Sequence, residues 1–348
     1  QLPLDYPRPA IQQFDGRKVQ SLLSHELLGR CKAFAASEGV SLFMLMSGVF
    51  RVLMAKYQVA SDLVLGTPVA GRHRREWQSM IGMFVNTVAL RFNLDQTQSF
   101  STVLSELKQQ TLNDFSHQDY PFELLPEQLN IPRNTAKNPL FDIYFVLQNE
   151  DMGLDGDGVQ MLPVDIGIAR FDLTVICREL KNQSADHGMT IDWEYATSLF
   201  DAWTIKQMAM HFEQVLEQLM DQPQNAVSEA SCLTPDEYQK LVVEYNQTET
   251  DYPANEPVQV LFERQVAKAP DAIAFRYVEN GDQVAVELTY EQLNTSANQL
   301  AHQLLEEGVK PEQIVALYLP RSVDMAIAIL AVLKVGATYV PIDSANPE

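Results

Sequence analysis

Between residues 246 and 257 the chain loses its hydrophobic periodicity. This segment holds Thr, Asp, Asn and Glu together with two prolines. It follows a capping box at Thr234 and Glu237, with Pro235 at the first helical position, which predicts one short helix before it. Polar segments with prolines are typical of connections between domains. We therefore predict two folding units, over residues 1–225 and 258–348, joined by a linker over 226–257.

The first unit mixes helical and extended patterns. Apolar residues recur at helical spacing over 41–57, and residues 63–69 form an apolar run that enters a turn. Further strands are predicted over 85–92, 142–147, 171–179 and 189–195, and further helices over 100–116 and after Asp201. These elements predict a mixed α/β domain that is long enough to bury its own core.

The second unit alternates strands and helices. Thr289 and Gln292 form a second capping box, which predicts a helix that ends at Gly308. The elements expected after it are a strand over 314–319, a helix over 322–336 and a strand over 339–342. This β–α–β order predicts a parallel sheet. The pattern stops at Glu348, so we expect the unit to be incomplete and the chain to be a piece of a longer protein.

Charge and cysteine content exclude several classes of function. The chain has 25 Lys and Arg against 46 Asp and Glu, a net charge of −21. Such acidity argues against non-specific binding to nucleic acids or to anionic membranes. The three cysteines are widely spaced, so we expect neither a disulfide framework nor a zinc site, but a reducing cytoplasmic setting. We also find no signal peptide and no apolar run long enough to span a bilayer.

The residue pattern alone assigns no reaction centre. None of the six histidines lies at ligand spacing from another, and no glycine-rich phosphate loop occurs. His117 precedes Asp119 by two residues, but side chains two apart on a helix face different directions. A histidine at a helix end beside a loop carboxylate is favoured over a catalytic dyad. For the basic loop over residues 71–75, a solvated turn is likewise favoured over a phosphate site.

Five short motifs follow one another along the first unit. They are LPLDYPRP at 2–9, VLGTPVAGR at 64–72, IGMFVNT at 81–87, HQDYPFE at 117–123 and NPLFD at 138–142. In content and order they resemble condensation domains of nonribosomal peptide synthetases. The sequence departs from the family over 133–139, where the usual acidic residue, Ser and second Arg are replaced. A family salt bridge through that acidic residue is therefore not carried over.

Two motifs of the second unit resemble the first core motifs of adenylation domains. They are LTYEQLNTSAN at 288–298 and LKVGATYVPID at 333–343. Condensation, linker and adenylation in this order resemble an elongation module. The implied fold is α/β: the C-terminal lobe of a condensation domain, similar to chloramphenicol acetyltransferase, followed by an incomplete N-terminal subdomain of an AMP-binding adenylation domain.

The resemblance implies two activities for the parent protein. One is peptide-bond formation between thioesters on carrier proteins, whose phosphopantetheine arms enter a tunnel between two lobes. The other is activation of an amino acid as its adenylate, for which ATP and Mg would bind the complete adenylation domain and not this fragment. The family's His-His-x-x-x-Asp-Gly motif lies in the other lobe, and no His-His pair occurs here. We therefore assign no catalytic residue and no metal ligand, and expect the fragment alone to be inactive.

Five positions are carried over from the motifs as lobe-interface or tunnel residues: Gly82, Phe84, Asn86, Gln118 and Asp119. Gly82 would allow a close approach of the backbone. Asn86 offers donors and acceptors to an amide-rich pantetheine arm. The structural alternatives are a turn glycine at 82, a core ring at 84 and a strand-edge cap at 86.

The expected partners are carrier domains, the other condensation lobe and the rest of the adenylation domain, without nucleic acid or membrane. Two alternatives remain open. One is a docking module without catalysis, in which Arg72, Arg74 and Arg75 meet an acidic carrier. The other is a CoA-dependent acyltransferase of the same superfold, against which the segment after Pro257 counts. A cyclization or epimerization relative also stays open, because the motif that sorts these lies upstream.

Overall fold

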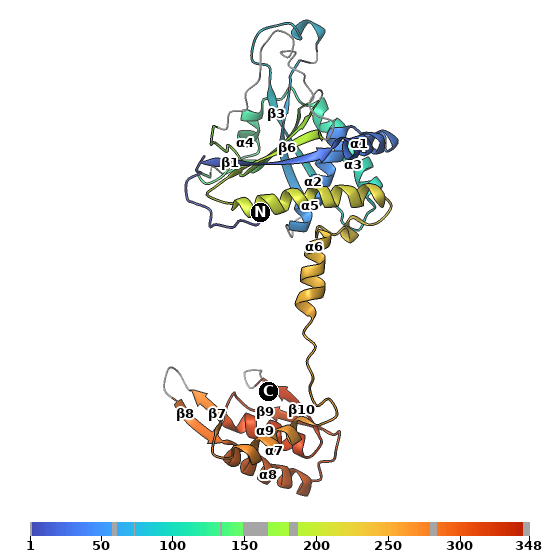
Figure 1. Cartoon of the computed structure of the whole chain (residues 1–348). Coiled ribbons are helices and arrows are strands. Elements are labelled where there is room, and N and C mark those ends of the chain that lie inside the picture. The colour runs from blue at the N-terminus through green and yellow to red at the C-terminus, as the bar shows by residue number, and fades with distance from the viewer. Residues whose placement is uncertain are drawn as a thin grey trace. The chain divides into compact units, whose positions relative to one another are not determined.

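A computed structural model gives the fold of the chain in two compact units, residues 1–247 and 248–348. It describes residues 2–57, 61–72, 74–132, 134–148, 166–180, 187–278 and 284–343. Figure 1 shows the elements of both units. Each unit is described by itself.

In the described part of the first unit, six strands form one mixed sheet in the order β1-β6-β5-β4-β2-β3. Their bounds are Gly16–Ser24 (β1), Asp62–Val69 (β2), Asn86–Asn93 (β3), Ile143–Gln148 (β4), Leu173–Glu179 (β5) and His187–Ala196 (β6). The pairs β4–β5 and β2–β4 are parallel, and the other neighbours are antiparallel. The mixed α/β class and the strands predicted from β2 onward are confirmed.

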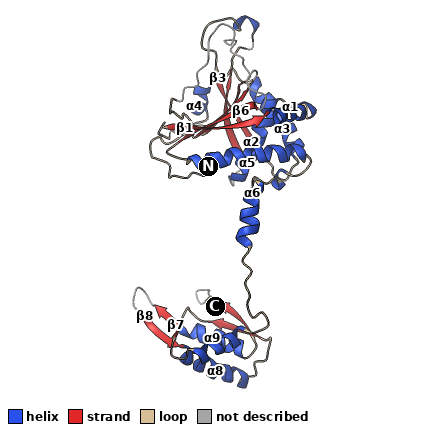
Figure 2. Ribbon diagram, viewed as in Figure 1, coloured by secondary structure: helices blue, strands red, loops and turns tan. Residues whose placement is uncertain are grey.

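The helices of this unit pack against the sheet, and α2 lies at the centre. The bounds are His25–Ser37 (α1), Leu42–Tyr57 (α2), Phe100–Ser116 (α3), Leu125–Gln128 (α4) and Ala202–Asp221 (α5). Figure 2 shows α2 and α5 beneath the sheet. Residues 44–55 of α2 are buried on all faces, as expected for a helix inside a core. The helix predicted after Asp201 is α5, and the Asp201 side chain caps it by accepting a hydrogen bond from the Trp203 amide.

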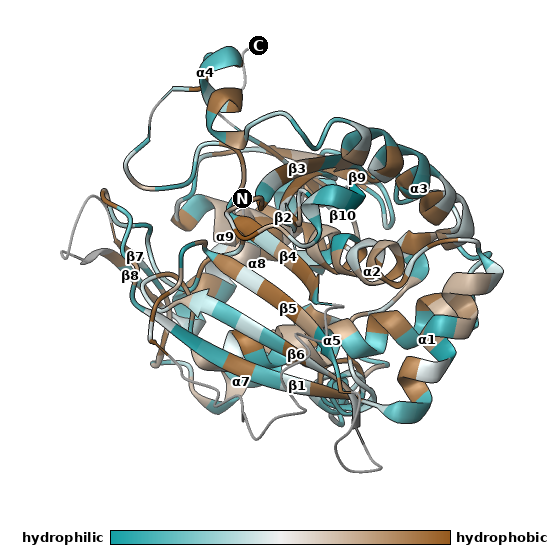
Figure 3. Cartoon of the chain, turned by 90° about the horizontal axis from the view of Figure 1, so that it is seen from above, coloured by the Kyte–Doolittle hydropathy of each residue, from teal (hydrophilic) through white to brown (hydrophobic). Residues whose placement is uncertain are grey.

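An aromatic cluster joins these layers. Phe50 of α2 lies 5.4 Å from Phe145 of β4 and 6.2 Å from Trp193 of β6, measured between ring centroids. Trp193 in turn lies 5.8 Å from Phe212 of α5. The indole nitrogen of Trp193 donates to Ser21 Oγ at 3.0 Å, so this buried polar group is paired. Figure 3 shows apolar stretches, in brown, along β4 and β5.

A buried arginine ties α2 to the strands that carry the candidate site. The Arg51 guanidinium is almost fully buried and donates to the carbonyls of Leu63 on β2 and Leu90 on β3, both at 2.9 Å. Burial lowers the pKa of Arg51 to about 10, so the side chain is still a cation at neutral pH. The two hydrogen bonds of Arg51 hold β2 and β3 against α2.

The second unit contains the predicted β–α–β arrangement. Its helices are Val258–Lys268 (α7), Tyr290–Glu306 (α8) and Val323–Lys334 (α9), and its strands are Ile273–Val278 (β7), Val284–Thr289 (β8), Ile314–Tyr318 (β9) and Thr338–Ile342 (β10). Strands β9 and β10 pair in parallel around α9, while β7 and β8 are antiparallel. The Thr289 capping box is present at α8. Ile314 and Tyr318 of β9 and Val340 and Ile342 of β10 are exposed.

Candidate functional site

The connection from β2 to β3, residues 70–85, begins with a tight crossing of the backbone. Gly71 has φ +65°, and a Cβ at this position would lie 1.9 Å from the carbonyl oxygen of Phe84. Both the left-handed conformation and the close approach require glycine here. The two arms of the connection are therefore held side by side where they leave the sheet. We call residues 71–85 the β2–β3 hairpin; His73 lies outside the described residues.

Arg72 organises this hairpin from within. Its guanidinium donates to the carbonyls of Trp77, of Met80 at 2.7 Å and of Gly82 at 3.1 Å. The same group lies 4.2 Å from the ring centroid of Phe84, close enough for a cation–π contact. The structure thus brings together Arg72, Gly82 and Phe84, which the sequence had placed in two separate groups. Arg72 is engaged with the hairpin. Arg74 and Arg75 are exposed, and the Arg74 guanidinium lies 5.0 Å from the ring centroid of Trp77.

Loss of Arg72 is expected to loosen the hairpin. Arg72→Ala removes three hydrogen bonds and one ring contact. Because water competes for these partners at an exposed site, the net loss of stability is smaller than the sum of the four contacts. We expect about tenfold faster proteolysis within residues 76–83, because cleavage follows the population of the open form. Arg75→Ala, in the same loop, is the matched control and should leave the rate unchanged. Equal rates for both variants would contradict the role of Arg72.

The end of the hairpin presents apolar side chains to solvent. Ile81 is 105% exposed and Met83 90% exposed, and Met80 and Val85 are more than half exposed. A cluster of this kind is unusual on a free surface and typically marks a contact with another protein or domain. We call Met80, Ile81, Met83 and Val85 the apolar tip.

Asn86, the first residue of β3, fastens a second loop beside the hairpin. Its side-chain amide donates to the carbonyls of Gln118 at 2.8 Å and Tyr120 at 2.7 Å. Its side-chain oxygen accepts from the amide of Phe122 at 3.3 Å. The HQDYPFE motif is thereby held against the start of β3. Asn86, Gln118 and Asp119 are brought together in this way, and the amide of Asn86 is occupied by the protein's own backbone.

A cavity of about 290 Å³ opens next to this loop. It is lined by Thr87, Val88 and Ala89 of β3, by Asp114 and His117 of the α3 end, and by Tyr120 and Leu125. Burial raises the pKa of Asp114. His117 ends α3, and its Nδ1 lies 3.0 Å from the Asn113 carbonyl. The cavity therefore combines a largely apolar wall with one carboxyl and one imidazole group.

Sequence reasoning did not single out Asp114. Asp114 lies in the last turn of α3, three positions before the capping residue His117, and both residues line the cavity. The three-residue spacing is visible in the sequence, but the apolar residues dominate the helical pattern over 100–116.

Among the described residues, no group of three or more His, Cys, Asp or Glu side chains is placed to hold a metal ion. In the same part of the chain no single helix is long and apolar enough to cross a bilayer, although the bent pair of α1 and α2 meets that test together.

Comparison with known proteins assigns the first unit. A protein-family model of the condensation domain matches residues 1–242, and a model of AMP-binding enzymes matches residues 262–348. The chain belongs to the condensation-domain family. We refer to the two parts as the condensation unit and the AMP-binding unit. The predicted resemblance and the predicted order of the two parts are confirmed.

Curated relatives carry the same two parts in succession. Surfactin synthase subunit 1 of Bacillus subtilis (strain 168) is 40% identical over 350 residues, covering 100% of this chain and 10% of the relative. Tyrocidine synthase 2 of Brevibacillus parabrevis is 39% identical over 352 residues, with the same coverage of 100% and 10%. The chain thus spans about a tenth of the length of these relatives.

Solved structures agree with this assignment. A four-domain nonribosomal peptide synthetase bound to AMP and glycine matches 99% of this chain with a TM-score of 0.75 and 25% identity, over 27% of its own length. The X-domain from teicoplanin biosynthesis matches 67% of this chain with a TM-score of 0.59 and 25% identity, over 53% of its own length. Both units are therefore homologous to parts of nonribosomal peptide synthetases.

Proposed function

We propose that the chain acts within an elongation module of a nonribosomal peptide synthetase. The observation that carries this proposal is the succession of the condensation and AMP-binding matches within one chain. The condensation unit would help to join two thioesters on carrier proteins. The AMP-binding unit would belong to the domain that activates an amino acid as its adenylate. We place this activity in the cytoplasm, where three free cysteines remain reduced.

The apolar tip supports a contact with a second condensation lobe. Ile81 and Met83 are almost fully exposed at the end of a hairpin that Arg72 holds in shape. Burying such side chains stabilises an interface by about 25 cal/mol for each Å² of apolar surface removed from water. We propose that they pack against the lobe that carries the His-His-x-x-x-Asp-Gly motif. In this arrangement Gly82 and Phe84 would lie at the interface of the lobes.

The reaction itself needs a base from that second lobe. The acceptor amine attacks the carbonyl carbon of the donor thioester; a C–N bond forms, the C–S bond breaks, and the donor phosphopantetheine leaves as a thiol. The amine proton passes to the histidine of the partner lobe, which returns it to the departing sulfur. Within this chain, we propose that Asn86, Gln118 and Asp119 line the tunnel for the two phosphopantetheine arms. Asn86 would act by positioning the loop, since its amide is bonded to that loop.

Carrier proteins are the proposed docking partners of the basic loop. Arg74 and Arg75 are exposed and suit an acidic surface, while Arg72 would act by holding the hairpin. Charged rim residues of this kind raise association rates in a salt-dependent manner. A docking module without catalysis uses the same surface. The two functions differ in whether an amide product forms.

The AMP-binding unit supports a further contact. The exposed apolar residues of β9 and β10 are proposed to be covered by the remaining strands and helices of an AMP-binding domain. A parallel pair is normally buried on both faces by its neighbours. ATP and Mg would bind only that complete domain, because the 348 residues contain no glycine-rich phosphate loop.

Reconstitution tests the proposal. The chain alone, mixed with two aminoacyl-loaded carriers, is expected to give no amide product and no amino-acid-dependent pyrophosphate exchange. Adding a separately produced condensation lobe with the His-His-x-x-x-Asp-Gly motif should give amide product, detected by mass spectrometry of the carriers. Met83→Asp should abolish binding of that lobe, while the exposed Ile11→Asp serves as control. Amide formed by the chain alone, or none by a bound lobe pair, would refute the proposal.

A further inference from the structure

The beginning of the predicted linker is folded onto the condensation unit. Residues 227–246 contain a 3₁₀ turn (Val227–Glu229), the helix α6 (Pro235–Tyr238), a π-helical turn (Gln239–Val243) and a second 3₁₀ turn (Glu244–Asn246). The Val227 side chain is fully buried, and the Ser231 amide donates to Gln218 Oε1 of α5 at 2.9 Å. The first compact unit extends to Gln247. This segment therefore has its own attachment to the condensation unit.

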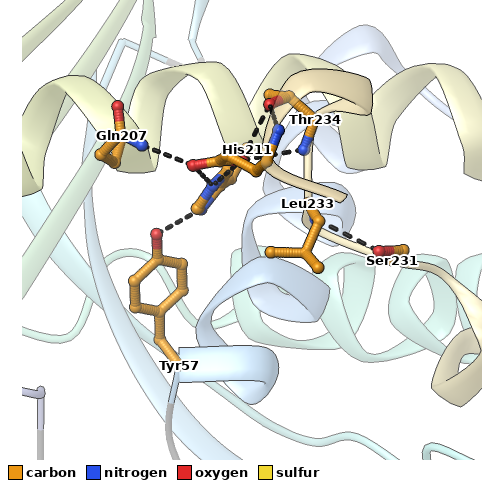
Figure 4. A network of polar contacts seen from close by, with 7 residues as sticks. Tyr57, Gln207, His211, Ser231, Leu233 and Thr234 are labelled. Carbon is orange, nitrogen blue, oxygen red and sulfur yellow. Dashed lines mark hydrogen bonds and ion pairs between the residues drawn. The ribbon is translucent and has the colours of Figure 1, made fainter. Parts of the chain in front are cut away.

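A chain of polar contacts makes that attachment, as Figure 4 shows. The hydroxyl of Tyr57, at the end of α2, lies 2.5 Å from Nδ1 of His211 on α5. Nε2 of His211 lies 2.9 Å from Oε2 of Glu237 on α6. The whole His211 residue is only 8% exposed. We call Tyr57, His211 and Glu237 the clasp.

Hydrogen-bond chemistry fixes the direction of each contact in the clasp. An ionised carboxylate only accepts, so Nε2 of His211 donates to Glu237. In a neutral imidazole the other nitrogen then accepts, and the Tyr57 hydroxyl donates to Nδ1. In both contacts of the clasp, a donor therefore faces an acceptor. The network is partly buried, with His211 at its centre, and its satisfied contacts favour one arrangement of the three side chains.

The carboxylate of Glu237 has a second task. It accepts from the amide and the hydroxyl of Thr234, both at 2.9 Å, and Thr234 Oγ1 accepts from the Glu237 amide at 3.3 Å. This is the capping box of α6. One carboxylate therefore both starts the helix and holds it to α5. Release of the clasp would remove the cap at the same time.

We propose that the clasp sets the length of the tether between the two units. With the clasp closed, the connection between Gln247 and the start of α7 at Val258 spans 11 residues, 247–257. With the clasp open, the anchor retreats to the 3₁₀ turn that starts at the buried Val227, and residues 231–246 are added, so that the tether spans 231–257. The extended reach then grows from ~40 Å to ~90 Å. The effective concentration of one unit near the other falls ~4-fold, since it scales with length to the power −3/2.

This inference rests on the proposed function only for its consequence. A short tether matters where both units serve the same carrier protein. The clasp itself is tested without carriers, ATP or amide formation. Failure of the reconstitution described above would therefore leave the test of the clasp intact, and the reverse also holds.

Acid is expected to open the clasp. Burial alone would raise the pKa of Glu237, but hydrogen bonds from Thr234 and His211 outweigh burial and lower it. The other titratable groups that face the carboxylate are Tyr57 of α2 and Cys232 of the preceding segment, with Lys56 beside Cys232. Because the pKa is lowered, the ionised carboxylate stabilises the closed form at pH values above about 4.3, the ordinary pKa of a glutamate. This stability is lost as the pH falls through the lowered pKa of the closed form.

Hydrogen exchange of the full chain tests the clasp. In Glu237→Gln the amides of residues 231–246 should exchange about tenfold faster, while β5 and β6 keep their protection. The control is Glu244→Gln, an exposed residue of the same segment, which should exchange like the unmodified chain. Unchanged exchange in Glu237→Gln, or an equal loss in β5 and β6, would overturn the proposal.

Two further measurements separate a clasp from a merely stabilising contact. Tyr57→Phe should open the same segment, and adding it to Glu237→Gln should produce less than the product of the two single effects, because both residues contact His211. Glu237 also accepts a hydrogen bond from the Gln207 side chain of α5, so its single effect should be the larger. Small-angle scattering should show a larger radius of gyration for Glu237→Gln than for Glu244→Gln. Faster exchange without this expansion would overturn the claim about tether length, and independent effects of the two substitutions would overturn the relay.

Discussion

Replacing Asn86 with alanine is expected to release the HQDYPFE loop from β3 and to lower the stability of the condensation unit by about 2–3 kcal/mol. The change removes two hydrogen bonds to the carbonyls of Gln118 and Tyr120 and one from the Phe122 amide. Each is worth about 1 kcal/mol, and the three backbone groups lose their partners together. Denaturant unfolding measures the loss of stability, and hydrogen exchange over residues 117–124 shows where it arises.

Two further variants make this result specific. Asn93→Ala removes an exposed asparagine at the other end of the same strand, and should change stability by less than about 0.5 kcal/mol. Asn86→Asp keeps an acceptor for Phe122 but loses both donors, so it should resemble Asn86→Ala. Equal stability of Asn86→Ala and Asn93→Ala would show that the loop is held by other contacts.

Phe50→Ala is expected to have the largest effect on the fold, a loss of about 3–5 kcal/mol. Phe50 is fully buried and joins the rings of Phe145 and Trp193, so its removal leaves a cavity between α2 and the sheet. The layers cannot close over it, because Arg51 on the next position holds α2 to β2 and β3. Thermal and urea unfolding both report this loss.

The control for the aromatic cluster is Phe14→Ala. Phe14 is 53% exposed, so the same chemical change there should cost less than about 1 kcal/mol. Similar losses for the two phenylalanines would contradict a core centred on Phe50. A loss well below 2 kcal/mol for Phe50→Ala would mean that the neighbouring rings collapse into the space.

Much of the fold could be predicted because it is local. The capping box at Thr289 and the periodicity of residues 41–57 mark their helices directly in the sequence. β1 could not be found in this way. Its residues, Gly16–Ser24, are largely polar, and they form a strand because they pair antiparallel with β6, about 180 positions later. The pattern of residues 189–195 predicts β6, but nothing in the residues of β1 alone indicates a partner so far along the chain.

The site was predictable only in part, for a related reason. The motifs pointed to Gly82, Phe84 and Asn86, but not to the hydrogen bonds that join them to their neighbours. Arg72 looks like one more charge in a basic loop, and its contact with Gly82 exists only because Gly71 turns the chain back on itself. The role of Glu237 depends likewise on His211, which lies 26 residues earlier on another helix.

The position of the clasp also bears on recombination between synthetases. A crossover at residue 226 would take Thr234 and Glu237 from one parent and Tyr57 and His211 from another, and the chimaera would keep its attachment only if both parents carried matching halves. A crossover after Gln247 transfers the complete set with the condensation unit. Hybrid enzymes joined at the second point should therefore inherit the spacing of their donor, whereas those joined at the first should vary with the pair chosen.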